Sequence, residues 1–141
     1  MIDTLPDKPS ALIRLAISDL EKCAKSLDYH ISMKHWHVPI SSGTCLVCLA
    51  GSVMAQSLGC DARMPFYPSS FCQSLEDKFD ALNYFRRGRI ADGLGMLGHS
   101  VPNGINSYCE SINAIEDYRS DPEAFKSQLL ALADVLEAAK L

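Results

Sequence analysis

The sequence lacks the features that would assign this chain to a membrane, to nucleic acid or to nucleotide chemistry. No apolar run reaches the length of a membrane-spanning helix, and the N-terminal residues show no basic-then-apolar export signal. The formal net charge of −4 disfavours general nucleic-acid binding, which depends on clustered Lys and Arg. The sequence contains neither G-x-x-x-x-G-K-[ST] nor G-x-G-x-x-G, so nucleotide hydrolysis and dinucleotide binding have no support. We expect a cytoplasmic protein that does not contact membranes.

Internal repeats, low-complexity tracts and long linkers are also missing. The 141 residues, 48% of them hydrophobic and 21% charged, have the composition of a globular protein. We therefore expect residues 1–141 to form a single domain. No nucleophile-elbow or cysteine-hydrolase signature occurs, so the sequence assigns no catalytic residue and no cofactor.

Most of the chain has the three- and four-residue apolar spacing of helices. The expected helices span residues 9–27, 44–58, 74–87, 89–97 and 107–118, with a last helix that starts at Asp121 and Pro122. In the first of them the apolar stripe consists of Ile13, Ile17, Leu20, Ala24 and Leu27. The helix at residues 44–58 is apolar almost all round, which is typical of a buried, central helix. The predicted fold is thus mainly α, a compact bundle of five to six helices around that central helix.

One segment has the alternation of a strand instead. In residues 29–38, Tyr29, Ile31 and Met33 alternate with polar side chains, and Pro39 ends the pattern. No second strand of comparable quality is visible. We therefore expect either an extended arm or half of a small hairpin.

The most unusual residues lie next to this segment. His35, His37, Cys45 and Cys48 combine imidazole and thiol ligands, which zinc prefers in tetrahedral sites. A strand would point both histidines to one face, and a helix starting at Thr44 would place both cysteines on one side. Cys45 would also lie at the helix N-terminus, where a redox-active thiolate is stabilised.

Packing explains the same cysteines more simply. Cys45 and Cys48 lie within an apolar run, and free cysteines are usually small buried hydrophobes. The six cysteines are read as free thiols, because the chain has no export signal. Three interpretations therefore stay open: a zinc site, a redox pair and core packing. The packing role is favoured.

Two other groups of residues are candidates for interaction. Phe66 and Tyr67 lie in a loop between two prolines, and apolar loop residues either anchor a loop or bind a partner. Arg86, Arg87 and Arg89 surround Gly88 at an expected helix end. They could hold a phosphate, but cations at a helix C-terminus also complement the helix dipole. The nearby acids favour a solvated face of mixed charge.

Residues 36–39 and 45–55 resemble small proteins of uncharacterised function encoded by bacteriophages and prophages, and residues 82–97 look similar too. The resemblance implies a bacterial host cytoplasm and an accessory role such as inhibiting a host factor. Together with the absence of a catalytic signature, the mild acidity and the aromatic loops, it leads us to expect a non-enzymatic protein that binds a host or phage protein, or a second copy of itself. The alternatives are a metal- or thiol-dependent protein and a small-molecule-binding protein.

Overall fold

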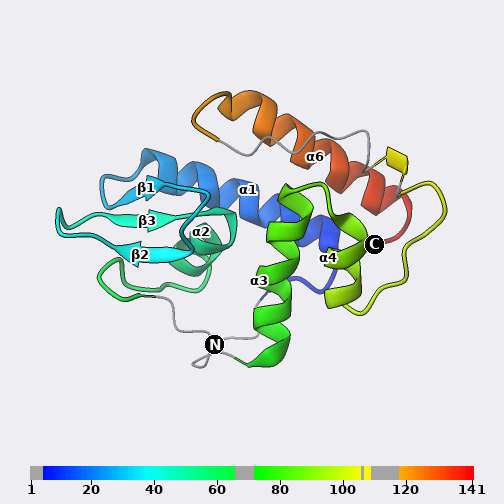
Figure 1. Ribbon diagram of the computed structural model, residues 1–141, viewed down its shortest axis with the longest axis horizontal. Coiled ribbons are helices and arrows are strands. Elements are labelled where there is room, and N and C mark those ends of the chain that lie inside the picture. Colours follow the sequence, from blue (N-terminus) through cyan, green and yellow to red (C-terminus); the bar gives the residue numbers. More distant parts are fainter. Residues whose placement is uncertain (1–4, 66–71, 106, 109–117) are drawn as a thin grey trace.

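The computed structural model describes residues 5–65, 72–105, 107–108 and 118–141. Within them the chain forms five helices and a three-stranded sheet (Figure 1). The elements in chain order are α1 (Pro9–Lys25), β1 (Tyr29–Ile31), β2 (His37–Pro39), β3 (Cys45–Val47), α2 (Leu49–Gln56), α3 (Gln73–Arg86), α4 (Ile90–Met96) and α6 (Pro122–Ala138). The prediction of a mainly helical protein is confirmed. In this part of the chain, no helix combines the length and the apolar character needed to cross a membrane.

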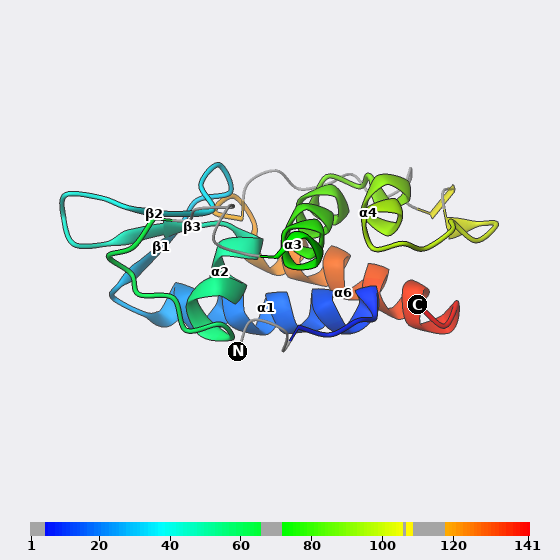
Figure 2. The ribbon, with the colours of Figure 1, turned by 90° about the horizontal axis from the view of Figure 1, so that it is seen from below.

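The sheet corrects the prediction for residues 29–48. The expected single strand at 29–38 is two short strands, β1 and β2, separated by a turn at 32–36. Their partner is β3, which pairs parallel with β1 and antiparallel with β2 and so lies in the middle. Cys45–Val47 belongs to the apolar run that predicts the helix at 44–58, so the sequence indicates no partner strand. Figure 2 shows α1 and α2 on one side of this sheet.

The predicted helix at 44–58 is correspondingly shorter, because its first residues belong to β3. Helix α2 begins after Cys48, whose backbone is extended, and ends at Gln56. Every residue from Leu49 to Met54 is buried. Gly59 follows with a φ of 69°, the left-handed conformation that glycine commonly adopts after a helix. Helix α2 contacts α1, α3, β2 and β3.

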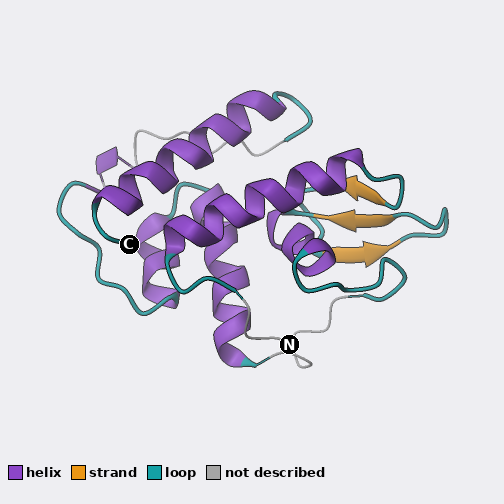
Figure 3. Ribbon diagram, turned by 180° about the vertical axis from the view of Figure 1, so that it is seen from behind, coloured by secondary structure: helices purple, strands orange, loops and turns teal. Residues whose placement is uncertain are grey.

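Helices α1 and α6 lie side by side along the molecule (Figures 1 and 3). The start of α6 is as predicted: Asp121 caps it by accepting a hydrogen bond from the Ala124 N–H at 3.0 Å, and Pro122 follows. Its apolar residues recur at helical spacing and are all buried: Phe125, Leu129, Leu132 and Leu136. In α1 the prediction fails at the C-terminal end. Ala24 is exposed within the last turn of the helix, and Leu27 is 96% exposed because the helix ends at Lys25, before this residue.

Helices α3 and α4 pack against each other after the turn at Gly88, where φ is 72°. The apolar side of α3 is buried and consists of Leu75, Phe79, Leu82 and Phe85, which recur at helical spacing. A Cβ at Gly93 would lie 2.8 Å from a ring carbon of Phe85, so this glycine permits the close packing of α4. The predicted helix at 107–118 lies mostly outside the described residues. Within that range the structure describes residues 107, 108 and 118, and the first two are helical.

Candidate functional site

The turn between β1 and β2 is seated directly on the first turn of α2. A Cβ placed on Gly51 would lie 1.4 Å from the carbonyl oxygen of Trp36 and 2.6 Å from its carbonyl carbon. Only glycine fits such an approach of backbone to backbone. Gly51 therefore fixes where Trp36 lies. The indole then packs edge-on against Phe79 of α3, with ring centroids 5.8 Å apart and an interplanar angle of 86°.

A pocket of about 450 Å³ opens on one side of Trp36, between β2 and α3. We call it the aromatic pocket; its lining residues are Lys34, His35, Trp36, His37, Val38, Pro65, Glu76, Phe79 and Asp80. Its walls are mostly apolar, and Val38 at its edge is 38% exposed. Pockets of this size and apolar character commonly take a side chain or a small molecule.

A second pocket, of about 470 Å³, adjoins it and shares Lys34 and Trp36. We call it the basic pocket; it is lined by Met33, Lys34, Trp36, Asn83, Arg86 and Arg87. Three of these six residues are cationic and none is acidic. Arg86 is 8% exposed, whereas Lys34 and Arg87 are exposed.

One face of α3 lines both pockets. It comprises Glu76, Phe79, Asp80, Asn83 and Arg86, which are related by helical steps of three or four residues, and it continues to Arg87 just after the helix. The acids lie toward the N-terminal half and the arginines at the C-terminal end, as the helix dipole favours. Partial burial and then the neighbouring Asp77 raise the pKa of Asp80. The face therefore changes from acidic to basic along its length.

The three predicted arginines separate in the structure. Arg86 and Arg87 line the basic pocket, but Arg89 turns away from it. Its guanidinium lies 2.6 Å from a carboxylate oxygen of Asp92 and 4.6 Å from the centroid of the Tyr84 ring. The other interaction candidates, Phe66 and Tyr67, lie outside the described residues.

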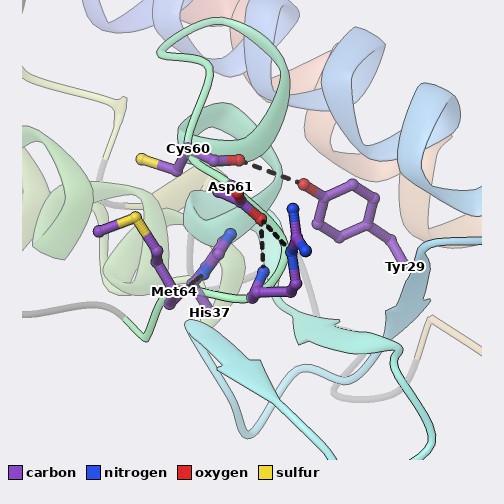
Figure 4. A network of polar contacts seen from close by, with 6 residues as sticks. Tyr29, His37, Cys60, Asp61 and Met64 are labelled. Carbon is purple, nitrogen blue, oxygen red and sulfur yellow. Dashed lines mark hydrogen bonds and ion pairs between the residues drawn. The ribbon is translucent and has the colours of Figure 1, made fainter.

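His37 is buried beneath the loop that follows α2 (Figure 4). Its Nδ1 lies 2.6 Å from the carbonyl oxygen of Met64. Because a carbonyl only accepts, Nδ1 carries the proton and Nε2 is left with its lone pair. Nε2 is itself buried, with no hydrogen-bond partner among the described residues. Burial lowers the pKa of His37, against smaller opposing contributions from the Met64 carbonyl and Asp61.

His35 is placed differently from His37, so the prediction that both imidazoles share one face of a strand is wrong. His35 lies in the turn before β2, and its Nδ1 forms a 2.8 Å hydrogen bond with the hydroxyl of Ser32 in the same turn. The turn residues 32–36 break the two-residue alternation on which the prediction depended.

Cys45 and Cys48 are both buried, in agreement with the packing interpretation. The helical placement of Cys45 is wrong, since it lies on β3 and Cys48 is the residue that precedes the helix. Burial is the main reason that the pKa of Cys45 is raised to about 11. Burial also raises the pKa of Cys48, although the N–H groups of Gly51 and Ala50 and the charge of Arg86 oppose it. Raised pKa values disfavour the reactive thiolate.

The candidate metal ligands do not converge. Among the residues that the structure describes, which include all four candidates, no group of three or more His, Cys, Asp or Glu side chains could hold a metal ion. The five cysteines within the same ranges are free. Zinc binding by His35, His37, Cys45 and Cys48 stays a prediction, which metal analysis of protein purified without chelator would test.

The sequence did not reveal several of the side chains that line the two pockets around Trp36. These are Met33, Lys34, Val38, Pro65, Phe79 and Asn83. A usable signal was present in α3. Glu76, Asp80, Asn83 and Arg87 recur on the face beside its buried stripe. The strand side gives no comparable signal, because the alternation in residues 29–38 predicts a continuous strand where the structure has the turn that carries Lys34 and Trp36.

Comparison with known proteins adds no assignment. No protein-family model matches the chain, and neither a curated protein nor a solved structure matches it significantly.

Proposed function

We propose that this chain is a non-enzymatic accessory protein of a bacteriophage or prophage, which acts in the host cytoplasm by binding a host or phage protein at the aromatic pocket. The observation that carries the proposal is the pocket itself. Trp36, Val38 and Phe79 offer apolar surface beside each other, and buried aromatic contacts of this kind contribute much of the energy of protein interfaces.

The occupant we propose is an apolar side chain of the partner, inserted between β2 and α3. Addition of a partner strand to the sheet is a poorer fit, because Pro39 in β2 has no N–H to donate. Glu76 and Asp80 on one wall and Lys34 on the other supply charges around the apolar centre. Interfaces commonly combine an apolar centre with such a polar rim.

Two exposed residues near each other in the sequence provide a matched test. Val38 lines the pocket and is 38% exposed, whereas Ile40 is 40% exposed and does not line it. We expect V38E to abolish capture of the partner from a bacterial lysate, because a carboxylate would enter the apolar site. I40E should leave capture unchanged. Thermal unfolding of both variants checks that each still folds.

The partner would be identified by mass spectrometry and then measured with purified protein by calorimetry. Loss of the central contact should weaken binding by about thirtyfold or more, corresponding to roughly 2 kcal/mol. Equal capture by the two variants would contradict the proposal. So would the absence of any protein enriched over bare resin.

A further inference from the structure

The basic pocket contains three cationic side chains. Binding of an apolar side chain in the neighbouring aromatic pocket would not require these charges. These cations come from two separate parts of the chain. Lys34 belongs to the turn before β2, while Arg86 and Arg87 end α3. The fold therefore brings together three positive charges in a chain whose net charge is −4.

Charge pairing within the protein does not account for two of these cations. Within the described residues, neither Lys34 nor Arg87 forms an ion pair with a carboxylate. The nearest acids on the same face of α3, Glu76 and Asp80, line the aromatic pocket and not the basic one. The exposed charges of Lys34 and Arg87 are thus available to a ligand.

We propose that the basic pocket binds the phosphate group of a small phosphorylated molecule. The Lys34 ammonium and the Arg87 guanidinium can together balance a phosphate dianion, and arginine donates paired hydrogen bonds to phosphate oxygens. The side-chain amide of Asn83 adds a further donor, and Trp36 and Met33 supply apolar surface for the carbon part of the ligand. The volume of about 470 Å³ suits a small ligand.

A small molecule fits better than a nucleic-acid backbone. A polyanion needs a basic surface that extends along many phosphates. The chain has 13 Lys and Arg, three of them in this pocket, and the remaining ten are outnumbered by the 17 Asp and Glu residues. This inference does not depend on the proposed partner protein, since Val38 lines only the aromatic pocket. Binding of phosphate and capture of a protein can therefore fail separately.

The fluorescence of Trp36 is a direct probe, because it is the only tryptophan in the chain and it lines the pocket. Inorganic phosphate, glycerol 3-phosphate and ribose 5-phosphate would be titrated at constant ionic strength, with glycerol, ribose and succinate as comparison compounds. Calorimetry with the same compounds detects binding that leaves the fluorescence unchanged. We expect saturable binding of the phosphates and weaker or no binding of the comparison compounds.

Two arginine variants separate a specific site from general attraction. R87Q should weaken binding of the phosphate monoesters by about tenfold or more, because a charge-assisted contact is lost. R89Q removes the same charge from a residue that lies two positions away but outside the pocket, and should leave the affinity within about twofold.

Several results would overturn the proposal. The absence of saturable binding by both methods up to about 20 mM ligand would show that the pocket takes no phosphate. Equal weakening in R87Q and R89Q would show only unspecific attraction. Succinate binding as tightly as the phosphates would make the ligand class wrong, and binding of a phosphopeptide or of single-stranded DNA alone would exclude a small molecule.

Discussion

The positive charges of this protein are used differently at the α1–α6 interface and at the basic pocket. At the interface, Arg14 lies 2.5 Å from a carboxylate oxygen of Asp134 and 2.7 Å from one of Glu137. Lys126 is likewise held between Glu21, at 3.0 Å, and Glu123, at 2.8 Å. In the basic pocket, Lys34 and Arg87 have no such partners within the described chain. Both cations at the interface are thus paired with carboxylates. Lys34 and Arg87 are not, so their charges are available to a ligand.

The two regions also differ in how they are held together. Helices α1 and α6 share a long contact with buried apolar residues along both partners. The turn that carries Trp36 depends on one close approach of backbone to backbone at Gly51. A single substitution should therefore damage the Trp36 region far more than the helix pair. The predictions below follow this contrast from the largest effect to the smallest.

The largest effect is expected from G51A. The new Cβ would lie 1.4 Å from the Trp36 carbonyl oxygen, and neither backbone segment can move aside as a flexible side chain would. We expect a loss of about 3 kcal/mol or more in the free energy of unfolding, measured by urea titration. Trp36 fluorescence should report a changed environment of the indole.

G95A is the control for G51A. Gly95 is also helical, but a Cβ there meets nothing within 4 Å. Since alanine favours helix over glycine by about 1 kcal/mol, G95A should be neutral or stabilising. A G51A protein as stable as G95A would show that the Trp36 turn is not seated as described, and both pockets would lose their structural basis.

The contrast between the helix pair α1–α6 and the turn that carries Trp36 also explains how far the sequence could predict the fold. The buried stripes of α3 and α6 and the cap at Asp121 were predictable, because local periodicity and capping chemistry determine them. Cys45–Val47 was misassigned, since a short apolar run fits a buried strand as well as a buried helix. The pairing of β3 with two strands of three residues each is a tertiary feature that such short segments do not reveal.

The candidate site was only partly predictable for the same reason. Arg86 and Arg87 were singled out by their position at a helix end, and they line the basic pocket. Lys34 and Trp36 reach that pocket only because Gly51 admits the backbone of the turn. No periodicity in the sequence encodes a contact between residues 36 and 51. It depends on the path of the chain through the sheet.

The next effect in size concerns His37, which is held neutral beside the aromatic pocket. Burial lowers its pKa below the ordinary value of 6.5, so the unfolded chain binds a proton that the folded state resists. His37 therefore does not reduce the free energy of unfolding above about pH 6.5, where it is neutral in both states. The free energy of unfolding decreases as the pH falls from there toward the lowered pKa, because the unfolded state takes up the proton first. Unfolding measured between about pH 5 and 8 should therefore show weaker pH dependence in H37Q than in the unmodified protein.

The exposed His30 provides the control for this measurement. H30Q should keep the pH dependence of the unmodified protein. The groups that face His37 are the Met64 carbonyl, the Tyr29 ring, whose centroid is 6.2 Å away, and Asp61. Equal slopes in H37Q and the unmodified protein would mean that His37 titrates as it does in the unfolded chain. In that case its burial could not be as described.

The smallest effects compare one arginine from each region. R14Q should lower the melting temperature by a few degrees, because it removes a cation from two carboxylates that join α6 to α1. R87Q should change the free energy of unfolding by less than about 0.5 kcal/mol, since it breaks no ion pair in the described chain and the residue is exposed.

Thermal and urea unfolding of the two variants measure this difference, and the effect of R14Q should shrink at high salt because the interface charges are partly exposed. R87Q could instead destabilise the fold as much as R14Q. Arg87 would then have a structural role at the end of α3, and the contrast between paired and available cations would fail. A stable R87Q protein that has lost phosphate binding would place the function of Arg87 in the pocket alone.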